Sequence, residues 1–215
     1  LARFNGELSR RIVDTISKIE VIASDDHELI AKLFSVAVQK FTDDESYRKF
    51  MLEIMKEADF GIENIKTEYG NIPEEEFMRQ IPDPFKVPGM FKNAMQHQIS
   101  VTKNKFDKNN KKISEIQFGF LAESSGTQQT FKISVLLAKV IFEGGMLIFD
   151  EFNTSLHPML CRFILKKFNS KNNSKNAILI FTTHDSSLLD KGFLRKDQIW
   201  FVEKNRFGAS ELYSL

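Results

Sequence analysis

The chain has 215 residues, of which 42% are hydrophobic and 27% charged, as expected for an ordinary globular protein. Thirty basic and 29 acidic residues give a formal net charge of +1, which excludes a general attraction to nucleic acid or to an anionic membrane surface. The single cysteine, Cys161, excludes an internal disulfide and fits a reducing cytoplasm. No apolar run approaches the ~20 residues of a membrane span, so we expect a cytoplasmic protein without membrane contact.

The first part of the chain has helical periodicity. In residues 7–57 apolar side chains recur every three or four positions, and the pattern includes Ile19 and Ala23. Aspartate pairs at positions 25–26 and 43–44 offer N-caps for further helices. Two interpretations stay open: helices packed on a domain, or a helical arm inserted into a sheet.

The next part, residues 61–115, predicts mixed β-structure and loops. Gly61 fits a helix C-cap, and a strand is predicted directly after it. Residues 70–89 hold four of the five prolines, which is typical of an exposed loop. A strand is predicted around Val101, and the alternation over residues 113–120 predicts a half-buried strand.

Five lysines lie between these last two strands, in a predicted polar turn over residues 103–112. They are Lys103, Lys105, Lys108, Lys111 and Lys112. Two interpretations are open: solubilising charge at a hairpin tip, or contact with a nucleic-acid phosphate backbone.

The stretch Met146–Phe149, followed by Asp150 and Glu151, is the most informative one in the chain. Four apolar residues that run into two carboxylates predict a buried strand ending at the carboxyl edge of a nucleotide-binding sheet. Asp150 is the candidate Mg²⁺ ligand, because hard cations prefer carboxylate and water oxygens. On an extended chain Glu151 would point away from Asp150, toward a lytic water for which it is the candidate general base.

Three further motifs flank this strand. ESSGTQQ at residues 123–129 leads into an apolar-periodic helix, NTSLHP follows at residues 153–158, and a second buried strand ends in TTHD at residues 182–185. Strands and helices that alternate at these lengths predict right-handed crossovers in a mainly parallel sheet.

In order and spacing, these pieces resemble the signature motif, Walker B motif, D-loop and switch histidine of ABC-class ATPases. The residues of these motifs are most similar to those of the AAA-15/AAA-21 type ATP-binding proteins of abortive-infection and other phage-defence systems. The resemblance is strong over residues 116–215 and weaker around residues 59–68. It implies the carboxyl-terminal lobe of a P-loop NTPase (ABC ATPase-like): a mainly parallel α/β sheet flanked by helices, with an amino-terminal helical segment. We therefore divide the chain into a helical insert or arm (1–60), a joining β and loop segment (61–115) and the ATPase lobe (116–215).

The resemblance also assigns roles to the flanking motifs. His184 would be the switch histidine that contacts the γ-phosphate and the attacking water. Residues 154–157 would be the D-loop that crosses between subunits; its members are Thr154, Ser155, Leu156 and His157.

The serine-rich motif offers backbone N–H groups and hydroxyls at the positive end of a helix, which suits a phosphate. By resemblance, Ser124, Ser125, Gly126 and Thr127 would meet the γ-phosphate of ATP held by the other subunit. Thr127 occupies the position at which the commonest ABC signature motif has glutamine, so its contact with the γ-phosphate stays an open question.

The chain contains no G-x-x-x-x-G-K-[ST] phosphate loop and starts at Leu1. We therefore expect the carboxyl-terminal part of a longer protein, inactive alone, whose cofactors are ATP and Mg²⁺. The expected partners are a second copy, through an ATP-sandwich interface, and an effector nuclease, with nucleic acid as a further candidate. An SMC-like DNA-maintenance ATPase is the alternative; it predicts long heptad arms, and the helical residues show no sustained apolar seam.

Overall fold

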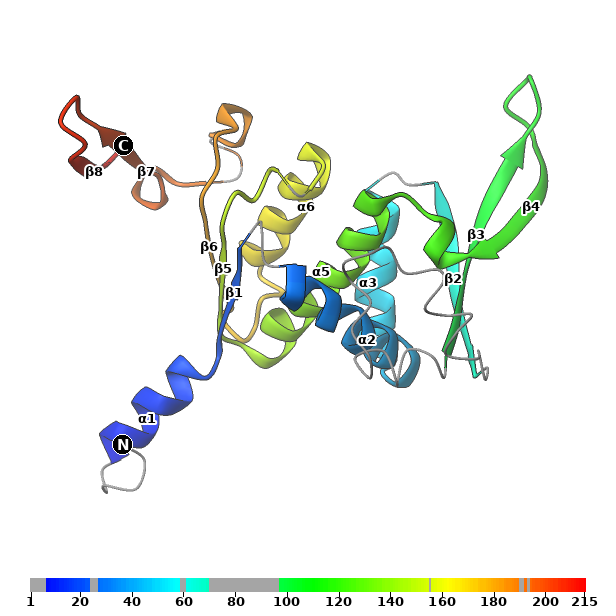
Figure 1. Ribbon diagram of the computed structural model, residues 1–215, viewed down its shortest axis with the longest axis horizontal. Helices are drawn as coiled ribbons and strands as arrows, with labels where there is room; N and C mark the ends of the chain where they lie inside the picture. The colour runs from blue at the N-terminus through cyan, green and yellow to red at the C-terminus, as the bar shows by residue number, and fades with distance from the viewer. Residues whose placement is uncertain are drawn as a thin grey trace.

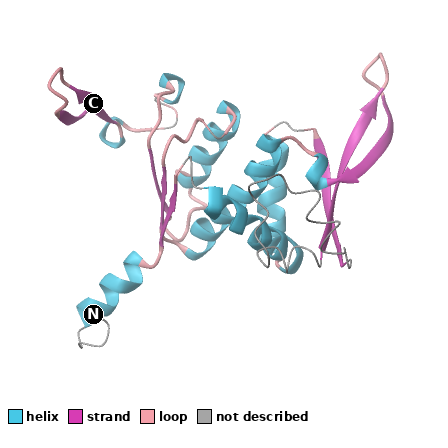
Figure 2. Cartoon of the chain, in the orientation of Figure 1, coloured by secondary structure: helices cyan, strands magenta, loops and turns pink. Residues whose placement is uncertain are grey.

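The structure is a computed structural model, and it describes residues 7–23, 27–58, 61–69, 97–154, 156–189, 192 and 194–215. A central layer of helices separates a small parallel sheet from an antiparallel sheet, and a carboxyl-terminal hairpin lies beyond the parallel sheet (Figure 1). Helices, strands and loops of the same view are distinguished in Figure 2.

The parallel sheet has three strands in the order β1 (Ile19–Ile22), β5 (Met146–Phe149) and β6 (Ile178–Phe181). Each strand has four residues, and all three are paired in register. This confirms the predicted parallel sheet with strands at the Walker B-like and TTHD motifs.

The two faces of this sheet differ in burial. Leu147 and Phe149 of β5 are fully buried in the core that the helices share. On the same face, Glu20 of β1 forms an ion pair with Lys139 of a covering helix. On the opposite face about half the surface of three apolar side chains is exposed: Val21 (52%), Ile178 (49%) and Ile180 (48%).

The helical layer consists of α2 (His27–Asp43), α3 (Glu45–Glu57), α5 (Ser125–Glu143) and α6 (Pro158–Phe168). α5 is the central helix, because ten of its residues are buried and it contacts α2, α3 and β5. The Asp44 side chain caps α3 as predicted for this aspartate pair, while the pair at 25–26 lies outside the described residues.

Aromatic rings fill the junction of α2, α5 and the short 3₁₀ helix η2 (Phe120–Ala122). The ring of Phe131 lies 4.8 Å from that of Phe120 and 5.6 Å from that of Phe41, centroid to centroid. Such offset and edge contacts add to the burial of apolar area, so α5 is held firmly in place.

The amino-terminal prediction is wrong at one point. Helix α1 (Glu7–Ile16) is present, but Ile19 belongs to strand β1 instead of continuing the helix. The sequence IEVI fits a strand as well as a helix, and pairing with β5 satisfies its backbone groups. Whether residues 1–60 form a separate arm stays a prediction, although β1 belongs to the parallel sheet.

The antiparallel sheet has the order β2 (Ile62–Tyr69), β3 (His97–Phe106) and β4 (Lys112–Gly119). Two predictions need correction here. β4 is not half-buried, since Phe118 alone among its residues is partly covered. The strand β3 also continues through Phe106, so the turn is shorter than predicted. The proline-rich stretch 70–89 lies outside the described residues.

The chain ends in strands β7 (Trp200–Lys204) and β8 (Ser210–Ser214), preceded by 3₁₀ turns η3 (Ser186–Leu188) and η4 (Lys196–Gln198). β7 and β8 pair with each other in an antiparallel hairpin that is separate from the parallel sheet. Within the described residues, no helix combines the length and the hydrophobicity needed to cross a membrane.

Candidate functional site

Two loops meet at the carboxyl edge of the parallel sheet. The acidic turn (residues 150–154) follows β5, and the threonine loop (residues 182–185) follows β6. They lie together because β5 and β6 are neighbouring parallel strands, which end at the same edge. Crevices at this edge are where open α/β sheets bind their ligands.

The chain turns sharply at Glu151 instead of staying extended, which corrects the prediction. Glu151 has φ of +51°, in the left-handed region that side chains larger than glycine rarely adopt. Its carbonyl oxygen accepts a hydrogen bond from the Thr154 amide at 2.9 Å, and its Oε2 accepts one from the Thr154 hydroxyl at 3.1 Å. The two carboxylates are therefore oriented by this turn, and not by the alternation of a strand.

Thr182 holds the acidic turn in place. Its hydroxyl donates to Oδ1 of Asp150 at 2.5 Å and accepts from the Glu151 amide at 2.8 Å. Its own amide donates to the carbonyl of Phe149 at 3.0 Å, and its carbonyl accepts from the amide of Phe152 at 3.0 Å. Four hydrogen bonds at one residue fix the backbone from which both acids project. Sequence reasoning gave Thr182 no role of its own, although TTHD contains it.

A second threonine connects the same loops. The Thr183 hydroxyl donates to Oδ1 of Asn153 at 2.7 Å and accepts from the Asp185 amide at 3.0 Å. Asp185 in turn caps η3, since its carboxylate accepts from the Ser187 amide at 2.8 Å. Hydrogen bonds to Ser187, together with the nearby charge of Arg162, hold the pKa of Asp185 below its usual value.

The predicted switch histidine, His184, lies between these threonine and aspartate anchors and is exposed to solvent. Its two neighbours in the chain are fixed by hydrogen bonds to Asn153 and Ser187. The backbone at His184 is therefore positioned beside the acidic turn, while its imidazole remains accessible.

The predicted D-loop leads from the acidic turn into α6. Thr154 bonds to Glu151, Leu156 is 5% exposed, and Ser155 lies outside the described residues. His157 is the N-cap of α6, where its Nδ1 accepts from the Met159 amide at 3.3 Å. A histidine cap followed by Pro158 at the first helical position begins this helix.

Cys161 of α6 lies beneath the site and is fully buried. Burial and the negative charge of Asp185 raise the pKa of its thiol to about 12. Its Sγ lies 3.7 Å from the carbonyl oxygen of Phe152 and 3.8 Å from that of Leu156. This thiol is a packing residue and not a nucleophile.

A third candidate segment, the serine turn (residues 123–127), begins α5. The Ser124 hydroxyl caps the helix by accepting from the Thr127 amide at 3.2 Å, and it lies 2.8 Å from the Thr127 hydroxyl. Ser125 and Gly126 are exposed, whereas Thr127 is only 2% exposed. The exposed backbone of the first helical turn is therefore accessible to an anion.

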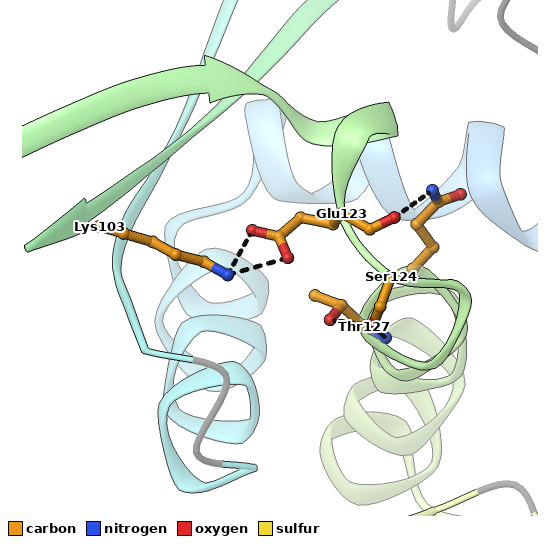
Figure 3. Close-up of polar contacts among 5 residues, drawn as sticks. Lys103, Glu123, Ser124 and Thr127 are labelled. Atoms are coloured by element: carbon orange, nitrogen blue, oxygen red, sulfur yellow. Dashed lines mark hydrogen bonds and ion pairs between the residues drawn. The ribbon is translucent and has the colours of Figure 1, made fainter.

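Lys103 of β3 anchors the serine turn (Figure 3). Its ammonium lies 2.8 Å and 3.0 Å from the two carboxylate oxygens of Glu123, whose side chain is only 5% exposed. The Gln128 side chain also donates to the Glu123 carbonyl at 3.0 Å. Sequence analysis placed Lys103 in a solvated turn, and it missed this role because the pair spans 20 residues.

The acidic turn and the serine turn belong to different elements. The serine turn begins α5, and the acidic turn follows β5, which is the next element after α5 in the chain. In the part of the chain that the structure describes, no hydrogen bond or ion pair joins the two turns.

The residues of the acidic turn fit a Mg²⁺–nucleotide complex better than a resident metal. Among the described residues, no group of three histidine, cysteine or acidic side chains is placed to hold a metal ion. A Mg²⁺ ion bound together with phosphates needs only one or two carboxylates, since waters and phosphate oxygens complete its shell. The exposed carboxylate of Asp150, already oriented by Thr182, meets that requirement.

Fold and site together define a class: a P-loop NTPase-like α/β protein with a parallel sheet flanked by helices. Comparison with known families agrees, because residues 8–190 match the family AAA_21, described as AAA domain, putative AbiEii toxin, Type IV TA system. That match covers most of the chain, and the protein belongs to this family. A search of curated proteins found no match. The family indicates a nucleotide-binding ATPase domain that uses ATP and Mg²⁺.

Proposed function

We propose that the chain supplies the Walker B, D-loop and switch-histidine half of an ABC-type ATPase site. Its reaction is Mg²⁺-dependent hydrolysis of ATP. The observation that carries this proposal is the Thr182 hydroxyl, which bonds at once to Asp150 and to the Glu151 amide. A pair of acids fixed in this way at the carboxyl edge of a parallel sheet is suited to one metal ion and one water.

The roles of the two acids follow from their environments. Asp150 is exposed and accepts the Thr182 hydroxyl on one oxygen, so its remaining lone pairs are free for Mg²⁺ or its water ligands. Glu151 is partly buried and accepts one hydrogen bond from Thr154. Its second oxygen is the general base that takes the proton of the attacking water. His184 would orient that water and contact the γ-phosphate.

The serine turn belongs to a second site in this proposal. By resemblance to ABC-class ATPases, it would meet the γ-phosphate bound by another copy. Backbone N–H groups at the start of α5 and the positive end of its dipole would stabilise the phosphate charge. Two copies would then close head to tail over two nucleotides, and residues 153–157 would couple the two sites.

The β- and γ-phosphates also need a phosphate loop, and the sequence of these 215 residues has none. We propose that another segment supplies this loop. The assembled ATPase would gate an effector nuclease in defence against phage; this role rests on analogy with the AAA-15/AAA-21 type proteins and not on the site.

A turnover assay on the purified chain tests whether ATP hydrolysis needs a phosphate loop from another segment. The expected result is no release of phosphate from Mg²⁺–ATP above the rate of a Glu151→Gln control. The chain would retain its fold and only weak affinity for Mg²⁺–ATP. Hydrolysis by the chain alone that Glu151→Gln abolishes would contradict the need for a separate phosphate loop.

A further inference from the structure

The hairpin of β3 and β4 projects from the body of the molecule (Figure 1). The residues at its far end include four lysines. We call Lys105, Lys108, Lys111 and Lys112 the basic tip. Residues 105–112 carry these four lysines and one aspartate, a net charge of +3, whereas the whole chain carries only +1. The end of this hairpin is therefore more basic than the chain as a whole.

The turn that presents the basic tip is fixed by hydrogen bonds. Oδ1 of Asp107 accepts from the amides of Asn109 and Lys111, each at 2.8 Å. The Asp107 amide donates to the Lys111 carbonyl at 2.9 Å, and Asn110 adopts the left-handed conformation with φ of +58°. The lysines thus extend from a defined turn, which lowers the entropy lost when they bind a ligand.

Three of the four charges have no ion-pair partner among the described residues. Lys112 forms an ion pair with Glu115 at 2.8 Å. Lys105, Lys108 and Lys111 are exposed, and among the described residues none of them has an acidic side chain within 4 Å. Other lysines of the chain are paired, such as Lys139 and Lys167. The basic tip is therefore free to neutralise an external anion.

Apolar side chains accompany these charges. Phe106 precedes the turn and is 55% exposed, and Ile113 follows it and is 60% exposed. A tip whose purpose was solubility would not need an exposed phenylalanine between lysines. Lysines interleaved with an exposed aromatic ring are suited to nucleic acid, since phosphates pair with the ammonium groups and bases stack on the ring.

We propose that the basic tip binds the phosphodiester backbone of nucleic acid. A two-stranded β-ribbon fits the major groove of a duplex, and Phe106 provides a stacking surface for an unpaired base. Three free lysines correspond to about three phosphate contacts, which gives weak binding with a steep dependence on salt. This inference is independent of the proposed ATP hydrolysis, because it uses none of the residues of the acidic turn or the serine turn.

The test uses fluorescence anisotropy of the full chain with a labelled 30-base-pair DNA duplex, a labelled single strand of the same length, and the matching RNA duplex. Affinity is measured from 50 to 250 mM KCl. The triple variant Lys105→Gln, Lys108→Gln, Lys111→Gln should weaken binding at least tenfold at 50 mM KCl. For a DNA duplex, the slope of log K against log salt should fall by about 3, because each lost phosphate contact removes about 0.9.

The matched control is Lys49→Gln, Lys56→Gln, Lys171→Gln, which removes the same charge from exposed positions elsewhere. It should bind as the wild type does, and circular dichroism should show both triple variants folded. No binding by the wild type, or an equal loss in both variants, would overturn the proposal. Equal affinity for poly-glutamate at the same salt would also overturn it, in favour of an acidic protein partner.

A single variant separates the two forms of nucleic acid. Phe106→Leu should weaken binding of the single strand several-fold if the ring stacks on a base, and should leave duplex binding unchanged. Single-strand affinity that is unchanged in Phe106→Leu would overturn the proposed stacking of a base on this ring.

Discussion

At the scale of single residues, the glycine of the serine turn is not required by the fold. A Cβ built at Gly126 meets only the Ser124 hydroxyl oxygen, at 3.9 Å, and Gly126 is not among the residues with positive φ. Alanine would therefore fit in the first turn of α5. The absence of a side chain at this position keeps the helix start accessible to a large anion, which agrees with the proposed phosphate contact.

The substitution Gly126→Ala should accordingly raise the free energy of unfolding, by up to about 1 kcal/mol, because alanine is the better helix former. The matched control is Gly145→Ala, where a Cβ would lie 2.5 Å from the Lys18 carbonyl oxygen and φ is +133°. The free energy of unfolding of that variant should fall by about 2 kcal/mol or more. Urea denaturation followed by circular dichroism measures both. A loss of stability in Gly126→Ala would mean that the fold itself needs this glycine.

The buried thiol predicts how stability depends on alkaline pH. In the folded chain the pKa of Cys161 is about 12, against an ordinary value of 9.0 in the unfolded chain. The unfolded state therefore loses this proton first as the pH rises. The contribution of Cys161 is complete below pH 9 and is lost progressively between pH 9 and about 12.

Between pH 9 and 11 the wild type should lose stability faster than Cys161→Ala, by up to about 1.4 kcal/mol per pH unit. Burial also raises the pKa of Tyr47 above its ordinary value, and this effect is common to both proteins. Urea midpoints measured at intervals of half a pH unit give the comparison. Parallel curves for the two proteins would show that the thiol titrates normally and is not buried as described.

At the scale of elements, the base of the β3–β4 hairpin fixes the start of α5. The ion pair of Lys103 with Glu123 is partly buried, with exposed fractions of 29% and 5% for the two side chains. Removing one partner of such a pair leaves the other charge without compensation, which costs more than the pair itself contributes.

Lys103→Met should therefore lower the free energy of unfolding by about 3 kcal/mol, and the double variant Lys103→Met, Glu123→Leu should regain much of that loss. The exposed pair of Lys112 with Glu115 serves as the control, and Lys112→Met should change stability little. Chemical denaturation of the four proteins completes the comparison. If the double variant is no more stable than Lys103→Met, the loss of Lys103 does not leave an uncompensated charge on Glu123.

Sequence patterns predicted local elements better than partnerships between them. The long helix α5 was predicted from its helical period, and β5 and β6 were predicted from short apolar runs that end in polar motifs. Strand β1 was missed because a run of four residues fits the period of a helix as well as that of a strand. Its pairing with β5 makes it a strand. Thr182 and Lys103 were not recognised, since hydrogen bonds over 31 and 20 residues leave no local signal.

At the scale of the whole molecule, the parallel sheet is covered on one face and open on the other. Parallel sheets are usually covered on both faces. In the described structure half-exposed Val21, Ile178 and Ile180 line the open face, and β1 and β6 are edge strands. This incomplete sheet agrees with the proposal that another segment, with the phosphate loop, completes the nucleotide site.

The proposed composite site agrees with both the family match and the sequence. The acids, the threonine loop and the serine turn are present in one chain, while the phosphate loop is not found in its 215 residues. The account therefore predicts a chain that recognises Mg²⁺–ATP weakly at the acidic turn.

Paramagnetic relaxation by Mn²⁺–ATP, in nuclear magnetic resonance spectra of the ¹⁵N-labelled chain, tests this central claim most directly. The account predicts selective broadening of amides in residues 150–154 and 182–185, at millimolar concentration, and its loss in the Asp150→Asn variant. Broadening confined to other parts of the chain, or unchanged in Asp150→Asn, would contradict the account.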